Sequence, residues 1–210
     1  MMTRARHLPH LLVLLSALAG VGGLPTAAQE LPEGMTAAEL AGIQRRMAAA
    51  AQPGEEHALM ATLVGEWHQV LRLTPAPGAD VMTMEGTATS EMILGGRFLK
   101  TESDLHLPGK EGGSLSILGF DRRSDEFNTI GMDTEGTYWV TAKGTYDEET
   151  RTITMSGEDY DPIFGHLQEY DFKTRFVDED TYVMEIWFKD AVHTRGGPPF
   201  MMIEITSTRR

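Results

Sequence analysis

Five histidines lie beyond residue 28 and are the first candidates for acid–base or metal chemistry, because imidazole changes charge near neutral pH. They are His57, His68, His106, His166 and His193. No two of them have the spacing that places both on one face of a helix, and no zinc-protease motif occurs. A metal site therefore depends on whether the fold brings two histidines together. From the sequence we expect no metal site.

Carboxylates are the second candidates. The runs 159–161 and 178–180 are acidic, but they lack the alternating carboxylates and central glycine of a calcium-binding hand loop, so they indicate polar turns. Charged residues within predicted strands could form an internal acid–base cluster: Glu91, Arg97, Glu102, Glu185 and Glu204. Glu185 and Glu204 alternate away from the apolar faces, which favours outward, solvated pairs.

Nucleophilic and phosphate-binding motifs are absent from the sequence after residue 28. There is no Gly-x-Ser-x-Gly elbow, no Ser-x-x-Lys pair and no phosphate-binding glycine loop. The chain has no cysteine, which excludes disulfides, thiolate metal ligands and thiol nucleophiles. We therefore expect no catalytic residue and no cofactor.

The charge balance limits the possible partners. The 210 residues carry 18 Lys and Arg against 31 Asp and Glu, a net charge of −13. Nucleic acid rewards basic patches, and none exists here, so nucleic-acid binding is excluded.

Residues 1–28 have the pattern of a secretory signal peptide. Arg4 and Arg6 precede an apolar run at 11–18, and small residues end the segment before Gln29. The apolar run is short and followed by glycines, so a cleaved leader is favoured over a membrane anchor. We expect an exported protein, periplasmic or secreted, with no stable membrane insertion after cleavage.

Two short helices are predicted after the leader. Thr36 and Glu39 form a capping box, with apolar residues at helical spacing after it and Pro53 ending the helix. The second helix covers 55–64. We assign 29–54 to an N-terminal helix and linker and 55–210 to one domain.

From residue 66 onward the hydrophobic period changes to two, which indicates strands. Ten are predicted: 66–73, 81–93, 97–106, 114–120, 127–133, 137–145, 151–159, 168–177, 181–189 and 200–208. The connections are short, so neighbouring strands should pair antiparallel in an up-and-down order. Ten strands in an open sheet would expose two edges, and closure removes them. The fold class is therefore mainly β, an antiparallel barrel of about ten strands. A two-sheet sandwich is the alternative.

Strand alternation selects the residues that should face the barrel interior. Methionine is frequent among them, and its flexible, polarisable side chain suits a permissive apolar pocket, although ordinary core packing is the alternative. The predicted ligand-binding residues are Met82, Met84, Met92, Tyr138, Val140, Tyr170, Phe172, Met184 and Ile186. Two phenol groups among them would orient a ligand.

Gly65 and Trp67 follow a short predicted helix and open the first strand. This arrangement resembles the start of lipocalins and the wider calycin barrels. That resemblance implies that the tryptophan seals the barrel floor and that a basic residue near the chain end, here Arg209, packs over it. Segments 93–99, 144–147 and 202–206 together resemble the bacterial domain-of-unknown-function family 1579, over about 57–209. The family implies a calycin-like barrel and supplies no catalytic residues.

These observations favour an exported barrel that binds a small apolar molecule without catalysis. Two other functions stay open. An enzyme acting on a hydrophobic substrate would need acids and a histidine converging in the cavity, and a protein-interaction module would have a barrel filled by side chains. The ligand's identity does not follow from the sequence.

Overall fold

The structure is a computed structural model that describes residues 34–107, 109–161 and 164–210. The predicted signal peptide, residues 1–28, lies outside the described residues. The chain divides into two units, residues 1–42 and 43–210. The boundary falls inside helix α1 (Ala37–Ala50). No helix of the described ranges combines the length and apolarity that a membrane span needs.

The described part of the first unit is the start of α1, and it carries the predicted capping box. The backbone N–H of Glu39 donates to the Thr36 hydroxyl oxygen at 3.2 Å, and the backbone N–H of Thr36 donates to the Glu39 carboxylate at 2.8 Å. These bonds satisfy amide groups that have no partner within the first turn of a helix.

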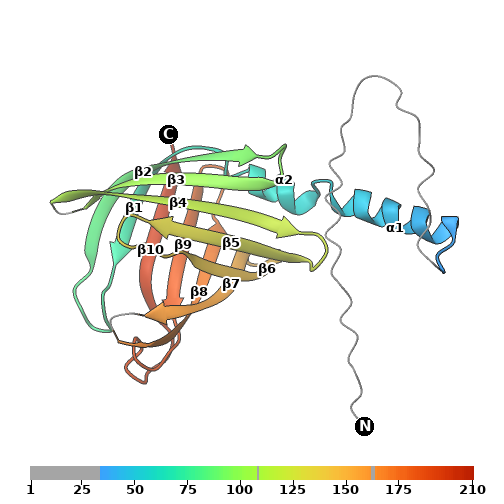
Figure 1. Cartoon of the computed structure of the whole chain (residues 1–210). Coiled ribbons are helices and arrows are strands. Elements are labelled where there is room, and N and C mark those ends of the chain that lie inside the picture. The colour runs from blue at the N-terminus through green and yellow to red at the C-terminus, as the bar shows by residue number, and fades with distance from the viewer. Residues whose placement is uncertain (1–33, 108, 162–163) are drawn as a thin grey trace, which may run out of the picture. The chain divides into compact units, whose positions relative to one another are not determined.

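The second unit is mainly β. Its strands are β1 (Gly65–Leu73), β2 (Met82–Ile93), β3 (Phe98–Leu107), β4 (Lys110–Asp121), β5 (Glu126–Asp133), β6 (Val140–Asp147), β7 (Thr152–Asp161), β8 (His166–Phe176), β9 (Thr181–Phe188) and β10 (Phe200–Arg209). Each strand pairs antiparallel with its neighbours in the chain, and β1 pairs with β10, so the sheet closes into a ten-stranded barrel (Figure 1). The predicted fold class is confirmed, and the sandwich alternative is wrong.

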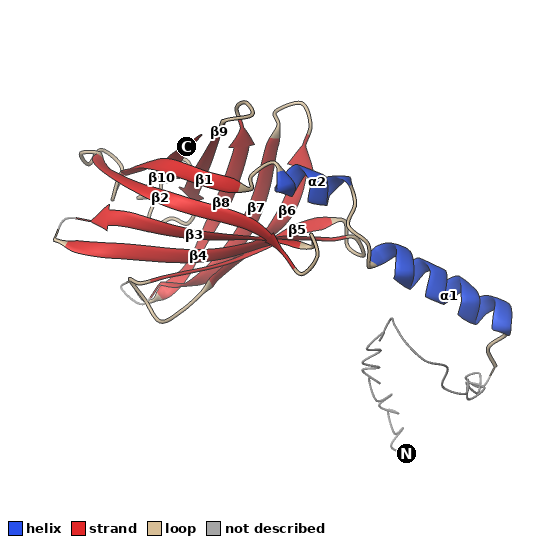
Figure 2. Ribbon diagram, turned by 90° about the horizontal axis from the view of Figure 1, so that it is seen from above, coloured by secondary structure: helices blue, strands red, loops and turns tan. Residues whose placement is uncertain are grey.

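In the closed barrel, the connections between strands lie alternately at its two ends. The start of β1 and the end of β10 meet at one end, where Trp67 lies opposite Arg209; we call this end the floor. The β1–β2, β3–β4, β5–β6, β7–β8 and β9–β10 connections all lie at the other end, which we call the mouth. Helix α2 (Glu55–Ala61) precedes β1 and packs at the floor, with Met60 fully buried in the core (Figure 2).

Most predicted strands begin and end within two residues of the observed ones. Two starts differ more. β4 begins at Lys110 because Gly112 and Gly113 pair with β3 instead of forming a turn. β6 begins at Val140, because Thr137, Tyr138 and Trp139 belong to the β5–β6 connection. The second helix ends at Ala61 rather than residue 64, because the chain turns there to enter β1.

Candidate functional site

The barrel encloses a cavity of about 280 Å³. One wall is apolar and includes Leu71, Val140, Phe172, Met184, Ile186 and Ile205. The part of the lining that comes from β3, β4 and β5 mixes leucines, among them Leu99, Leu105 and Leu118, with hydroxyl groups: Thr101, Ser103, Ser114, Ser116 and Thr129. The cavity extends from Leu63, next to the floor, to Asp133 at the mouth end of β5. The interior is therefore an amphipathic chamber rather than a uniformly apolar one.

Four of the nine predicted ligand-binding residues line this cavity: Val140, Phe172, Met184 and Ile186. The other five do not. Met82 is 46% exposed at the start of β2, and Met84 lies two residues further along that strand, half-buried. Met92 packs against the core cluster opposite Leu99, close to the floor. Strand alternation predicts whether a side chain points inward, but not its position along the barrel axis. These three methionines do not line the cavity because they lie nearer the ends of the barrel.

The two predicted phenol groups also lie elsewhere. Tyr138 is 55% exposed, because β6 starts after it and its ring lies against Gly136. Tyr170 does point inward, but its ring lies over Gly157 and is buried in the core, with its hydroxyl donating to the Thr141 carbonyl at 3.2 Å. Neither of these two phenols lines the cavity.

Hydroxyl and amide groups provide the polar contacts of the cavity instead. In the described part of the chain, the hydroxyls of Ser103, Ser114 and Ser116 have no hydrogen-bond partner. Gln69 is 5% exposed and donates from Nε2 to the Ser207 hydroxyl at 3.3 Å. Its Oε1 is buried without a partner among the described residues. A buried acceptor without a partner costs about 1–3 kcal/mol, so Gln69 favours a donor in the cavity.

The floor is built around Trp67, which is 1% exposed. Its indole N–H donates to the Leu63 carbonyl at 3.0 Å, and the Arg209 guanidinium lies 4.3 Å from its ring centre. Arg209 also donates to the Val64 carbonyl at 2.8 Å. Gly65 has φ +142°, and a Cβ there would lie 2.5 Å from Arg209 Nη1. Glycine at 65 therefore allows the arginine to cover the tryptophan.

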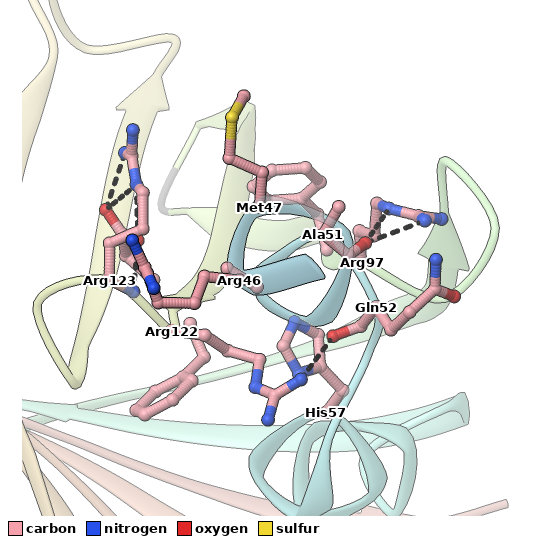
Figure 3. A pocket seen from close by; sticks show the side chains of 12 residues that line it. Arg46, Met47, Ala51, Gln52, His57, Arg97, Arg122 and Arg123 are labelled. Carbon is pink, nitrogen blue, oxygen red and sulfur yellow. Dashed lines mark hydrogen bonds and ion pairs between the residues drawn. The ribbon is translucent and has the colours of Figure 1, made fainter. Parts of the chain in front are cut away.

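A second hollow of about 530 Å³ lies outside the barrel and is lined by arginines (Figure 3). Arg97 donates to the Ala51 carbonyl at 2.8 Å, and Arg122 donates to the Ala49 carbonyl at 2.7 Å. These guanidinium groups cap the carbonyl end of α1, where cations are favourable. We therefore interpret the arginines of this hollow as structural residues that hold the end of α1.

His57 also lines this hollow; its side chain is buried, and its ring Nδ1 accepts the Gly54 N–H at 3.0 Å. Burial lowers the pKa of the His57 imidazole; the negative charge of Glu56 opposes this shift, and the positive charges of Arg122 and Arg97 add to it. The neutral ring can therefore accept the bond that begins α2.

Three of the four predicted strand carboxylates form ion pairs outside the cavity, and the fourth, Glu185, accepts a hydrogen bond from the Trp187 indole N–H at 2.7 Å. Lys100 bridges Glu91 at 2.6 Å and Glu102 at 3.4 Å, and Arg72 pairs with Glu204 at 3.7 Å. None of these side chains lines the cavity.

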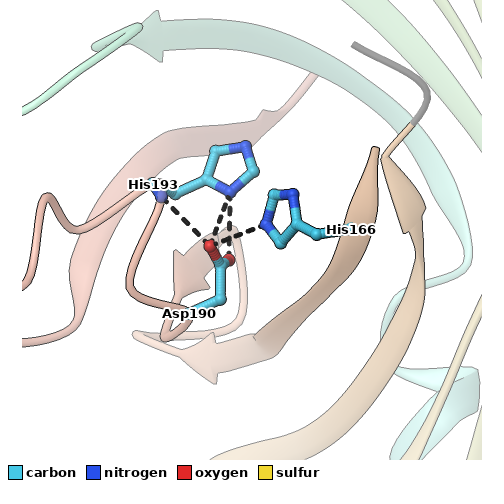
Figure 4. A group of neighbouring side chains, drawn as sticks. All are labelled: His166, Asp190 and His193. Atoms are coloured by element: carbon cyan, nitrogen blue, oxygen red, sulfur yellow. Dashed lines mark hydrogen bonds and ion pairs between the residues drawn. The ribbon is translucent and has the colours of Figure 1, made fainter. Parts of the chain in front are cut away.

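Two histidines meet at the mouth (Figure 4). His166 Nε2 lies 3.0 Å from Asp190 Oδ1, and His193 Nδ1 lies 3.0 Å from Asp190 Oδ2. The other ring nitrogen of His193 lies 3.4 Å from the Asp161 carboxylate. Burial raises the pKa of the Asp190 carboxyl, but hydrogen bonds from the His193 backbone and the His166 ring outweigh burial and hold the pKa at about 2. Asp190 is therefore ionised at neutral pH.

Sequence spacing misses this cluster because its members come from separate connections. Asp161 ends β7, His166 starts β8, and Asp190 and His193 lie in the β9–β10 connection. An up-and-down barrel places these connections at the same end, so the topology, combined with the predicted turns, is the signal that could find the cluster.

Ionisation of Tyr170 at alkaline pH should lower the free energy of unfolding. Burial, followed by the negative charge of Asp159, raises the pKa of the Tyr170 phenol to about 12. An unfolded tyrosine ionises near pH 10, so this stabilisation is complete below about pH 10 and is lost as the pH rises to about 12. The free energy of unfolding should fall in that window by roughly 2–3 kcal/mol more for wild type than for Tyr170→Phe. The free energy of unfolding is measured by urea unfolding at each pH. If it falls equally between about pH 10 and about pH 12 in wild type and in Tyr170→Phe, the prediction is contradicted.

Comparison with protein-family models gives a match over most of the chain. The model of a family described as "Protein of unknown function (DUF1579)" matches residues 52–209, which covers α2 and the whole barrel. A search of curated proteins finds no match to the chain.

Proposed function

The chain belongs to the DUF1579 family, whose description states no activity, and from the barrel interior we propose that it binds a small, mostly apolar molecule without catalysis. The observation that carries the proposal is the 280 Å³ cavity with one apolar wall. This volume is just below the roughly 300–1,000 Å³ of most ligand pockets, so the ligand is small.

The composition of the cavity supports binding over catalysis. Among the described residues that line it there is no histidine, and the one carboxylate is Asp133 at the mouth end. The carboxylates of β2, β3 and β10 that could have formed an acid–base pair are engaged outside, with Lys100 and Arg72. General acid–base chemistry needs a titratable group within hydrogen-bond reach of the substrate, and the deep part of the chamber offers only amides, hydroxyls and the Tyr182 phenol.

The polar groups of the cavity indicate which hydrogen-bonding groups the ligand has. Burial of an apolar body against Phe172, Met184 and Ile186 contributes about 25 cal/mol per Å². A hydrogen-bond donor at the inner end of the ligand would satisfy Gln69 Oε1, and the serine hydroxyls of β4 could bind a polar edge. We therefore propose a ligand with an apolar body and at least one hydroxyl or amide donor.

We further propose that binding takes place outside the cytoplasm, after cleavage of the leader. The leader pattern of residues 1–28 supports this. The resemblance to calycin barrels, which rests on Gly65, Trp67 and Arg209, is consistent with an extracytoplasmic carrier.

The test is a fluorescence titration with phenylnaphthylamine, a neutral apolar probe, against delipidated protein. Wild type should bind it saturably and with an affinity that added salt does not change, because no charge pair is involved. Met184→Glu places a carboxylate in the apolar wall, and we expect at least roughly tenfold weaker binding, since a charge is costly to keep in an apolar site.

Met82→Glu is the matched control, because it adds the same charge at an exposed position outside the cavity. Met82→Glu should keep the melting temperature close to that of wild type, and a melting curve of Met184→Glu checks that this variant is folded at the temperature of the titration. The proposal fails if wild type shows no saturable binding, or if Met82→Glu weakens binding as much as Met184→Glu does.

A further inference from the structure

The cluster at the mouth has the composition of a metal site. His166, Asp190 and His193 each direct one ligand atom toward the others, and these atoms all lie within 4.8 Å of one another. It is the one such group of three among the described residues. Asp190 is central: His193 Nδ1 lies within 3.1 Å of both of its carboxylate oxygens, and His166 Nε2 lies 3.0 Å from Oδ1 (Figure 4).

We propose that His166, Asp190 and His193 bind a divalent transition-metal ion of the zinc class. Two imidazole nitrogens and one carboxylate oxygen are ligands that zinc accepts, whereas calcium and magnesium prefer oxygen alone. Tetrahedral zinc, with bonds of about 2.0–2.2 Å, separates its ligand atoms by about 3.4 Å. Each imidazole nitrogen now lies 3.0 Å from the Asp190 carboxylate, so small side-chain movements suffice.

Asp161 supplies the outer support that such sites use. With His193 Nδ1 on the ion, Nε2 carries the proton and points at the Asp161 carboxylate, 3.4 Å away. A carboxylate behind a metal-binding histidine fixes the ring orientation and raises its basicity. Asp161 is 5% exposed, so this position is held within the barrel wall. The two carboxylates would also balance the charge of a divalent ion.

The backbone of the β9–β10 connection preorganises the ligands. The N–H groups of Val192 and His193 both donate to Asp190 Oδ1 at 3.0 Å, and the Thr194 hydroxyl donates to the Asp190 carbonyl at 2.8 Å. Phe188 stacks on the His193 ring with 4.5 Å between ring centres, which limits rotation of the imidazole. An ion would link this connection to the start of β8 through His166.

The cluster is separate from the proposed ligand cavity, because none of its residues lines that cavity. The site leaves one tetrahedral position for water or another small donor, since the chain provides three ligands. Loss of the metal site would therefore leave the binding of an apolar probe in place, and each proposal can fail without the other.

The experiment is a zinc titration of chelator-treated full-length chain by calorimetry, together with the visible absorption of the cobalt-substituted protein. Wild type should bind one ion per chain, and cobalt should give the intense bands of a tetrahedral site. His166→Ala and His193→Ala should each lose more affinity than the roughly 10- to 100-fold expected for Asp161→Asn, which removes only the outer support.

His68→Ala is the matched control. His68 also faces a carboxylate, Glu85 at 3.5 Å, but it is exposed and belongs to no group of three possible ligands among the described residues. The His68→Ala variant should bind zinc with the affinity of wild type. Melting curves of the metal-free variants check folding. Zinc should raise the melting temperature of wild type and of His68→Ala, but not that of His166→Ala or His193→Ala.

The absence of saturable zinc binding by wild type would overturn the proposal, whatever the variants do. The same holds if His166→Ala and His193→Ala bind zinc with wild-type affinity, or if His68→Ala loses as much affinity as they do. In these cases the cluster serves only to fold the β9–β10 connection.

Discussion

Trp67→Ala should cost roughly 3–5 kcal/mol in the free energy of unfolding, the largest effect of a side-chain truncation that we expect in the barrel. Trp67 is fully enclosed, packs edge-on against Tyr182 at 4.8 Å and lies under Arg209. Truncation removes these contacts and leaves a cavity between α2 and β10. Urea unfolding followed by circular dichroism measures the difference.

Trp139→Ala is the control for this experiment. Trp139 lies in the β5–β6 connection and is 65% exposed, so its truncation should change the unfolding free energy by no more than about 0.5 kcal/mol. Equal effects of the two substitutions would mean that the floor does not stabilise the barrel.

Gly144→Ala should destabilise the barrel by about 3 kcal/mol or more, although it adds only one methyl group. Gly144 lies in β6 opposite Met155 of β7. A Cβ at this position would overlap the Thr154 carbonyl oxygen and lie 2.7 Å from Met155 Cα. These are backbone atoms, so the substitution must separate β6 from β7 rather than rotate a side chain. A strand glycine here permits the close backbone approach.

Gly131→Ala separates this steric effect from the general effect of removing a glycine. Gly131 is also in a strand, β5, but a Cβ there would meet only Val140 Cγ2 at 3.5 Å, an ordinary contact. We expect little change in the melting temperature of this variant. A similar loss of stability in both variants, measured by thermal unfolding, would contradict the steric explanation.

The architecture could be predicted because the local signals were strong and consistent. Polar connections, most of them short and many containing glycine, separate the alternating strands, and short connections permit only antiparallel neighbours. The prediction was weakest at the β5–β6 connection, where Thr137, Tyr138 and Trp139 have the β propensity of a strand. Tyr138 lies over Gly136 instead, and the pairing of β5 with β6 extends only to Val140.

The site was harder to predict than the fold. Strand alternation correctly directed Phe172, Met184 and Ile186 to the interior, but it could not distinguish a side chain at the cavity from one that fills the core, such as Tyr170. The hydroxyl groups of the lining were missed because serine in a strand has no distinctive pattern. Likewise, His166 and His193 are 27 positions apart, and only closure of the barrel brings them together.

The central claim is that the barrel interior binds an apolar molecule, and methionine methyl NMR tests it most directly. Met155 and Met184 line the cavity, whereas Met47 and Met82 are exposed outside it. Saturation with phenylnaphthylamine should shift the methyl signals of Met155 and Met184 and give contacts between their methyl protons and the probe, while Met47 and Met82 stay unchanged. Shifts confined to Met47 or Met82, with Met155 and Met184 unmoved, would place the probe on the outer surface and contradict the account.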